Sequence, residues 1–294
     1  MKWTNKICIG TPQFSGFYGV TNKKKIKNNS KKIKKIFKSL RINNINYLDT
    51  ALDYEEAEKN LFDSKIDMSK FQIITKIPKP QNEKNYKEKI VNKIIESKKK
   101  FKIKKFNSIL LHDSRKLTKY QLEQVLEVLL FLKKEKLTRY VGFSIYGKKE
   151  LNIIIKHFTP DILQVPGNIF DRTFLDKRVL NKIKNKKIKL HVRSIFLQGI
   201  ILANMNFIKK KFKKWESIFY KWENYCQSKK YSKIQLATNY ILNINSIDKI
   251  IVGFNNSEQL HEFLAIKKFK VDLPKFTNRN KNFIEKLIKP YNWV

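Results

Sequence analysis

Residues 106–144 read FNSILLHDSRKLTKYQLEQVLEVLLFLKKEKLTRYVGFS, and they contain the unit that recurs along the chain. The apolar runs Phe106–His112 and Tyr140–Ser144 predict two buried strands. Between them, Lys119–Glu135 predicts a helix, because one face at helical spacing carries Leu122, Val125, Leu126, Leu129 and Leu130. A buried strand, a helix and another buried strand favour parallel pairing of the strands through a right-handed crossover.

The same alternation continues in both directions from this unit. Strand-like runs occupy Lys6–Gly10, Ile45–Asp49, Phe71–Lys76, Phe106–His112, Tyr140–Ser144, Asp161–Val165, Lys189–Ser194 and Lys249–Gly253. Helical patterns occupy Lys31–Leu40, Tyr86–Lys99, Lys119–Glu135, Lys148–His157, Leu175–Ile183 and Ser232–Leu242. A last helix is expected to begin near Ser257, with Ser257 or Asn256 as its N-cap.

Eight such units predict an α/β fold, a single (β/α)₈ barrel of the TIM type. An open doubly wound sheet is the alternative, but no GxGxxG follows the first strand. We expect one domain over residues 1–294, with a C-terminal tail from about residue 269. The sequence leaves open whether this tail covers a pocket rim, packs on the barrel or contacts another subunit.

Composition narrows the classes of protein. The 41% hydrophobic content supports a sizeable core, and 8 Gly and 7 Pro form no linker-like stretch. The apolar run at the start of the chain is too short for a secretory signal, and no apolar run is long enough to span a bilayer. Cys8 and Cys226 belong to no metal-binding cluster, so neither a disulfide framework nor a metal site is expected. These features predict a cytoplasmic protein without a membrane partner.

The formal net charge of +39 raises nucleic acid as a partner. However, the lysines are scattered over the whole length, and Ile and Asn are enriched with them, as in compositional drift toward A/T-rich codons. A nucleic-acid surface would concentrate charge and interleave aromatic residues. A nucleic-acid-binding protein therefore stays an alternative that we do not favour.

Polar residues stand at the ends of five predicted strands. They are Asp49, Lys76, His112, Ser144 and Gln164. Barrel enzymes place their chemistry at the C-terminal ends of the strands, so these side chains predict one site on one rim.

These residues belong to motifs that resemble those of the aldo-keto reductases. NYLDTALDYEEAE at 46–58 is similar to the family signature, in which Asp-Thr-Ala precedes a Tyr and then a Glu. GTPQF at 10–14, IITK at 73–76, LLHD at 110–113 and VGFS at 141–144 resemble further family motifs in the family order. Gln164, VRSIFLQG at 192–199 and Val-Gly at 252–253 continue the series, so the resemblance covers about residues 6–264.

The resemblance implies NAD(P)H-dependent reduction of an aldehyde or ketone by a catalytic tetrad of Asp49, Tyr54, Lys76 and His112. Tyr54 would be the general acid, because hydride transfer leaves negative charge on the carbonyl oxygen. A tyrosine pKa lies near 10, so an adjacent Lys76 ammonium is expected to lower it, with Asp49 holding that ammonium in place. His112 would donate a second hydrogen bond and orient the carbonyl.

The resemblance also implies a set of cofactor-binding residues: Gly10, Thr11, Asp49, Ser144, Gln164, Arg193, Ser194, Phe196, Gln198, Gly199, Gly253, Phe254, Asn255, Ser257, Gln259 and Glu262. Ser144 and Gln164 would hold the nicotinamide carboxamide, and 252–262 would lie by the adenosine. Family habit favours NADP(H) over NAD(H), although Gln259 stands where many NADPH-preferring members have Arg. Arg193 replaces an aromatic residue that stacks under the nicotinamide, and Ile145 and Phe263 replace frequent Asn residues.

The opening motif and residues 192–199 look like a bacterial branch linked to sugar or surface-polysaccharide metabolism. The expected partner is therefore a small carbonyl substrate, possibly sugar-derived. A non-catalytic cofactor-binding regulatory subunit on the same fold is the other alternative. The sequence does not indicate the oligomeric state.

Overall fold

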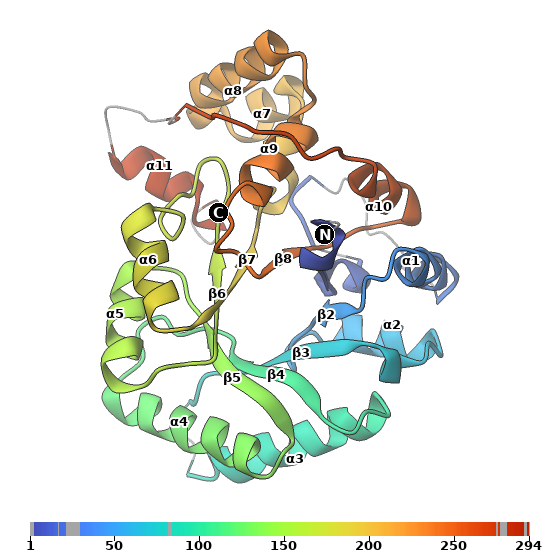
Figure 1. Ribbon diagram of the computed structural model, residues 1–294, viewed down its shortest axis with the longest axis vertical. Coiled ribbons are helices and arrows are strands. Elements are labelled where there is room, and N and C mark those ends of the chain that lie inside the picture. Colours follow the sequence, from blue (N-terminus) through green and yellow to red (C-terminus); the bar gives the residue numbers. More distant parts are fainter. Residues whose placement is uncertain are drawn as a thin grey trace.

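The closed barrel is confirmed: in a computed structural model, each strand pairs in parallel with the next, and β8 pairs with β1. The structure describes residues 3–16, 18–21, 30–81, 84–274, 276, 281–290 and 293. The strands are β1 (Ile7–Gly10), β2 (Tyr47–Asp49), β3 (Gln72–Ile77), β4 (Phe106–Leu111), β5 (Thr138–Ser144), β6 (Ile162–Pro166), β7 (Lys189–Arg193) and β8 (Lys249–Val252). Figure 1 shows the helices arranged around them.

The helices that follow the strands agree with the sequence pattern to within about two residues wherever a helix was predicted. They are α1 (Ser30–Ile42), α3 (Tyr86–Lys100), α4 (Lys119–Lys134), α5 (Lys148–His157), α6 (Lys177–Asn185), α9 (Lys233–Leu242) and α10 (Ser257–Leu264). Asn256 is the N-cap of α10, because its side chain accepts a hydrogen bond from the Gln259 backbone N–H at 2.9 Å.

Four helices were not predicted. They are α2 (Glu55–Asp63), α7 (Met205–Lys211), α8 (Glu216–Lys229) and α11 (Lys281–Leu287). The N-cap of α2 is Tyr54, which makes no capping hydrogen bond with its side chain, so the acidic residues of the first turn are the only start signal among the described residues of this helix. The short 3₁₀ helices are η1 (Trp3–Lys6), η2 (Pro12–Ser15), η3 (Met68–Lys70), η4 (Leu197–Leu202) and η5 (Lys213–Trp215).

The two faces of the strands contribute to two different hydrophobic clusters, one outside the barrel and one inside it. Alternate residues point outward into the layer between barrel and helices, where Ile73, Ile109 and Val141 belong to the largest hydrophobic cluster. The inward positions hold a small separate cluster of Cys8, Ile74, Leu110, Ile162 and Ile251. The residue two positions after each of these also faces inward, at or just beyond the C-terminal end of its strand.

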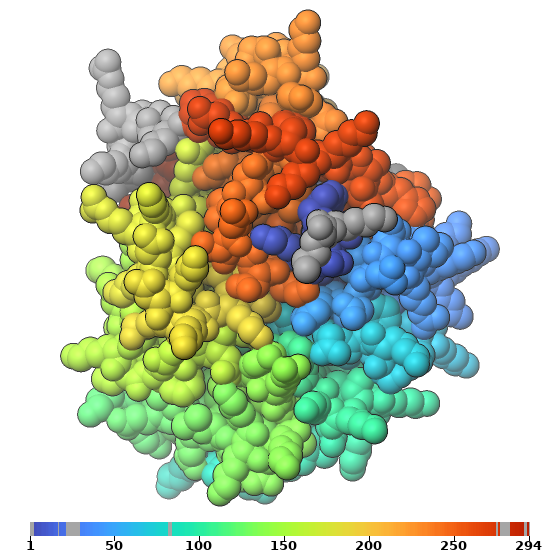
Figure 2. All heavy atoms as spheres, viewed as in Figure 1, coloured from blue at the N-terminus to red at the C-terminus, as the bar shows by residue number. Residues whose placement is uncertain are grey.

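A further core lies on top of the barrel, where α7 and α8 form the projecting lobe in Figures 1 and 2. Trp222 of α8 is fully buried there and donates from Nε1 to the Ile201 carbonyl at 3.0 Å. The described parts of the C-terminal tail pack against this lobe, with Phe276 against Trp222 and the Phe283 carbonyl accepting from Trp215 Nε1 at 2.9 Å. The described part of the tail also reaches the pocket rim, where a large cavity is lined by Glu285, Ile288, Lys289 and Pro290.

Gly142 allows the closest approach of β5 and β6. A Cβ atom at this position would lie 2.0 Å from the Ile162 carbonyl oxygen. We expect Gly142→Ala to lower the free energy of unfolding by about 2–4 kcal/mol, because paired backbones must separate. Gly147→Ala is the control, since its nearest neighbour would be the Glu150 carboxylate at 3.4 Å. Urea denaturation measures both, and equal stability of the two variants would contradict this reading.

Glu58 on the inner face of α2 predicts a pH dependence of stability. Burial raises its pKa from 4.5 to about 7, although the Thr50 hydroxyl donates to it at 3.5 Å. The folded state therefore holds this proton more tightly than the unfolded state, and stability is lost as the pH rises from about 4.5 to about 7. Relative to wild type, Glu58→Gln should gain about 2–3 kcal/mol between about pH 5 and about pH 8. Glu56→Gln, on the exposed face of α2, is the control. A stability difference independent of pH would contradict the prediction.

Candidate active site

The inward register brings the predicted polar residues together at the C-terminal end of the barrel. Lys76 follows the inward-facing Ile74 by two positions, His112 follows Leu110, and Gln164 follows Ile162. Asp49 ends β2 and Ser144 ends β5. Parallel strands present their carboxyl ends on one rim, so residues distant in sequence meet there.

Asp49 is the centre of a buried polar network. Its Oδ2 lies 2.6 Å from Lys76 Nζ, and its Oδ1 accepts from Gln164 Nε2 at 2.7 Å. Lys76 also donates to the Thr50 carbonyl at 2.8 Å. The side chains of Lys76 and Asp49 are only 2% and 5% exposed, so each ion is held by its partners instead of water.

Tyr54 and His112 meet above this network. The Tyr54 hydroxyl lies 3.2 Å from His112 Nε2, and Lys76 Nζ lies 5.5 Å from the centre of the Tyr54 ring. The four residues expected as a tetrad are therefore neighbours in the structure.

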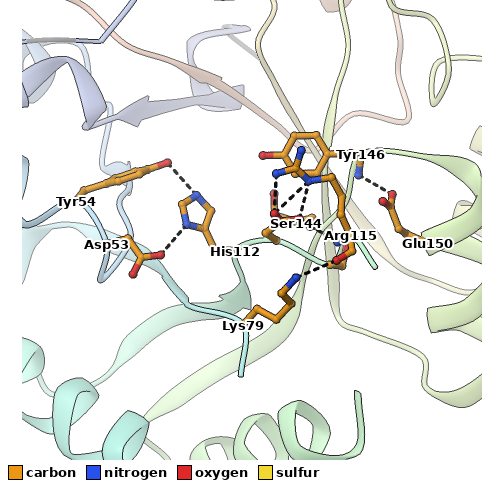
Figure 3. A network of polar contacts seen from close by, with 10 residues as sticks. Asp53, Tyr54, Lys79, His112, Arg115, Ser144, Tyr146 and Glu150 are labelled. Carbon is orange, nitrogen blue, oxygen red and sulfur yellow. Dashed lines mark hydrogen bonds and ion pairs between the residues drawn. The ribbon is translucent and has the colours of Figure 1, made fainter. Parts of the chain in front are cut away.

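Asp53 also belongs to this cluster, although the sequence pattern did not predict it as a site residue. Its Oδ2 lies 3.2 Å from His112 Nδ1, on the side of the ring away from Tyr54, as Figure 3 shows. The available signal was its position directly before Tyr54, but an acidic residue before a helix is commonplace. Its carboxylate is half-exposed, so it connects His112 to solvent.

The pKa of Tyr54 does not follow the expectation that Lys76 lowers it. Burial raises the pKa of the Tyr54 hydroxyl well above 10, and the Asp49 carboxylate adds to this effect, while Arg193 opposes it. Burial is the larger effect, and the 2.6 Å ion pair adds to it, because Asp49 offsets the charge of Lys76. Tyr54 is therefore held in its protonated form at neutral pH.

A large cavity of about 1760 Å³ opens over these residues. Tyr54, His112, Lys76 and Asp49 line it. So do most of the residues expected to bind a cofactor: Gly10, Ser144, Gln164, Arg193, Ser194, Phe196, Gln198, Gly199, Gly253, Phe254, Asn255, Gln259 and Glu262. Tyr18, which with Gly19 resembles part of the family's opening loop, also lines it, as does Tyr146, which the sequence did not single out.

Thr11 and Ser257 do not line this cavity. Thr11 is fully buried, and its backbone N–H donates to the Asp49 carbonyl at 3.0 Å. Ser257 begins α10, and its hydroxyl donates to Glu258 at 3.2 Å.

The loop after β7 has an unusual backbone. Ser194, Leu197 and Gln198 adopt positive φ angles of 61°, 46° and 53°, which non-glycine residues rarely do. Gly199 follows at 94°, and a Cβ there would lie 2.3 Å from the Thr21 hydroxyl. Such strain concentrates at ligand-binding segments, and this loop forms part of the cavity wall.

The start of α10 shows what Gln259 and Phe263 do. Gln259 Oε1 accepts from the Asn255 backbone N–H at 2.9 Å, so this side chain stabilises the helix start. Phe263 is fully buried against Trp3, Phe196 and Phe254. The frequent Asn of the family is therefore replaced here by a core residue.

Three cavity-lining side chains have buried polar atoms with no hydrogen-bond partner within the described residues: Gln164 Oε1, Arg193 Nη2 and Glu223 Oε2. Glu223 forms an ion pair with Lys233 at 2.5 Å, which leaves Gln164 and Arg193. Buried polar atoms are normally satisfied, so both are available to a bound molecule. A search of the described residues finds no group of three or more His, Cys, Asp or Glu that could hold a metal ion. None of the helices in the described ranges is long and apolar enough to cross a membrane.

Comparison with solved structures gives the same barrel. An aldo-keto reductase from Bacillus halodurans, in its holo form, has a TM-score of 0.70 and 17% identity, covering 97% of this chain and 92% of that chain. A glycerol dehydrogenase from Gluconobacter oxydans has a TM-score of 0.68 and 16% identity, covering 96% of this chain and 91% of that one. No curated protein matches the sequence.

The sequence profile described as "Aldo/keto reductase family" matches residues 6–278, which is nearly the whole chain. Enzymes of this family are oxidoreductases that use a nicotinamide cofactor to reduce carbonyl compounds. With the closed barrel and the residues gathered at its rim, the match shows that this chain belongs to the aldo/keto reductase family.

Proposed function

We propose that this enzyme reduces an aldehyde or ketone with Tyr54 as the general acid, assisted by Lys76, Asp49 and His112. The observation that carries the proposal is the 3.2 Å approach of the Tyr54 hydroxyl to His112 Nε2, directly above the buried Asp49–Lys76 pair. All four side chains line one cavity, so a carbonyl oxygen bound there can reach both Tyr54 and His112.

The proton is the part of the reaction that these residues supply. The bound nicotinamide cofactor supplies the hydride. Negative charge then develops on the carbonyl oxygen, and the protonated Tyr54 hydroxyl donates to it. Lys76, fixed by Asp49 and the Thr50 carbonyl, places a positive charge beside the Tyr54 ring and stabilises the phenolate that remains.

Asp53 and His112 provide a route for replacing that proton. With Asp53 at Nδ1, the neutral imidazole carries its hydrogen on Nδ1, and Nε2 faces Tyr54 as an acceptor. A protonated imidazole would instead donate from Nε2, either to the substrate oxygen or to the Tyr54 phenolate. We propose that His112 returns the proton to Tyr54, with Asp53 stabilising the charged ring.

The residues along the cavity fit a nicotinamide dinucleotide. Gln164 Oε1 is buried without a partner, and its Nε2 is fixed by Asp49, so it can accept a hydrogen bond from the carboxamide group. Ser144 ends the neighbouring strand and would contribute to the same interaction. The loop 194–199 would lie along the pyrophosphate, and 253–262 along the adenosine, next to the N-terminus of α10.

NADP(H) stays our preferred cofactor over NAD(H). Gln259 is engaged with the Asn255 backbone and brings no positive charge to a 2′-phosphate. That role falls to Asn255 or to a lysine on the cavity wall, where Lys210 and Lys230 lie. The preferred substrate is a small, sugar-derived carbonyl compound, consistent with the bacterial sugar-metabolism branch that residues 10–14 and 192–199 resemble. We further propose that the chain acts in the cytoplasm as one catalytic domain.

Tyr54→Phe tests the general acid. Turnover should fall by about 10²- to 10⁴-fold, because the ring stays but the proton donor is lost. The Kd for NADPH, measured by fluorescence titration, should change little. Tyr120→Phe is the matched control, since Tyr120 is 64% exposed on α4. Wild-type turnover in the Tyr54 variant would contradict the assigned role.

A binding titration with NADPH, NADH and ATP at moderate salt tests the cofactor. We expect one saturable nicotinamide site per chain, with NADPH bound more tightly than NADH and much more tightly than ATP. Equal, weak and salt-sensitive binding of all three would mean that the positive surface collects anions, as a nucleic-acid-binding protein would. Tight NADPH binding without turnover on any carbonyl compound would instead identify a regulatory subunit.

A further inference from the structure

A pair of arginines shares one aromatic ring beside the proposed reacting centre. Arg193 Cζ lies 4.3 Å from the centre of the Tyr146 ring, and Arg115 Cζ lies 4.5 Å from it. Figure 3 shows Arg115 against Tyr146, in the same part of the barrel mouth as Tyr54 and His112. Arg115, Arg193 and Tyr146 all line the cavity. Two positive charges held this close are unfavourable unless anions offset them.

The two arginines differ in their counterions. Arg115 donates from Nε and Nη2 to both oxygens of Asp113, at 2.7–3.1 Å, so its charge is offset. Arg193 makes no ion pair with any residue that the structure describes. Its Nη1 donates only a long hydrogen bond, 3.4 Å, to the Ser194 hydroxyl, and its Nη2 is buried without a partner.

The acidic residues near Arg193 form hydrogen bonds or ion pairs with other groups. Asp49 is held by Lys76 and Gln164. The Glu150 carboxylate accepts from the backbone N–H groups of Tyr146 and Gly147. Asp171 accepts from the Thr173 backbone N–H, and burial raises its pKa while the Arg193 charge lowers it. Among the described residues, none of these carboxylates forms an ion pair with the Arg193 guanidinium.

Arg193 and Tyr54 line the same cavity, so one bound molecule can contact both. Arg193 ends β7 two positions after His191, so its side chain faces the barrel mouth. Its positive charge also acts on the Tyr54 and Tyr18 hydroxyls, where it opposes the burial that raises the pKa of each. A molecule whose carbonyl meets Tyr54 can therefore reach Arg193 with a second group.

We propose that Arg193 is a specificity-determining residue that binds a carboxylate or phosphate on the substrate, a few bonds from the carbonyl group being reduced. The substrate class is thus an anionic aldehyde or ketone. This inference rests on the proposed reductase function. The anion uses the Nη2 edge of the guanidinium, where a planar donor suits an oxyanion.

Two matched substrate pairs test the inference: 4-carboxybenzaldehyde with its neutral analogue 4-formylbenzamide, and glyceraldehyde 3-phosphate with glyceraldehyde. Wild-type kcat/KM should favour the anionic member of at least one pair, and the preferred pair distinguishes a carboxylate from a phosphate. Arg193→Met should lower kcat/KM for that anionic member by about 10- to 100-fold, mainly through KM. The fall should be at least about tenfold larger for the anionic member than for its neutral analogue, so the variant loses the preference for the anion. Arg193→Lys keeps the charge and should recover part of the loss.

Arg178→Met, an exposed residue on α6, is the control for the loss of one positive charge from a basic protein. It should not change the preference. If Arg193→Met lowers both members of a pair equally and weakens NADPH binding in a fluorescence titration, Arg193 serves the cofactor and the inference is wrong. An absence of anion preference in wild type also overturns it. Failure of the proposed function would look different, because wild type would then turn over none of the four aldehydes.

Discussion

The carboxylate of Asp49 holds together the C-terminal ends of three strands. Through Lys76 and Gln164 it links β2 to β3 and β6, across the interior of the barrel and out of contact with water. Neither ion is stable there alone, since removing one partner leaves a buried charge unpaired. The position of Lys76 beneath the Tyr54 ring, and so the geometry available to the reaction, depends on this one carboxylate.

The network also explains how one site can hold a protonated Tyr54 beside a charged Lys76. Burial and the Asp49 carboxylate, which offsets the charge of Lys76, raise the pKa of Tyr54, so Tyr54 keeps its proton until the reaction removes it. The Lys76 charge is nevertheless in place for the phenolate that follows. His112 is connected instead to the half-exposed Asp53, and therefore to solvent. The hydroxyl of the buried acid Tyr54 and Nε2 of the solvent-connected His112 lie 3.2 Å apart.

Strand positions, and the polar residues at the strand ends, could be predicted from sequence because they follow from period and order. The tetrad assignment, including Tyr54, came from the family resemblance instead. Buried parallel strands are short apolar runs, and a period of two fixes which residues face inward. Asp53, Tyr146 and the lone Nη2 of Arg193 could not be predicted. Their importance comes from distances between loops of different units, which no local pattern records. The predicted lowering of the Tyr54 pKa by Lys76 was wrong, because the net effect on that pKa depends on burial and on the position of every charged neighbour.

The lobe of α7, α8 and the C-terminal segment has a consequence for the order in which the site is synthesised. All eight strands lie before residue 253, so the barrel can close without the end of the chain. Glu285, Ile288, Lys289 and Pro290 nevertheless form part of the cavity wall. The strands that carry the reacting centre therefore precede, in order of synthesis, the segment that completes the cavity wall. A chain that ended before residue 285 would keep every barrel strand and lose part of that wall.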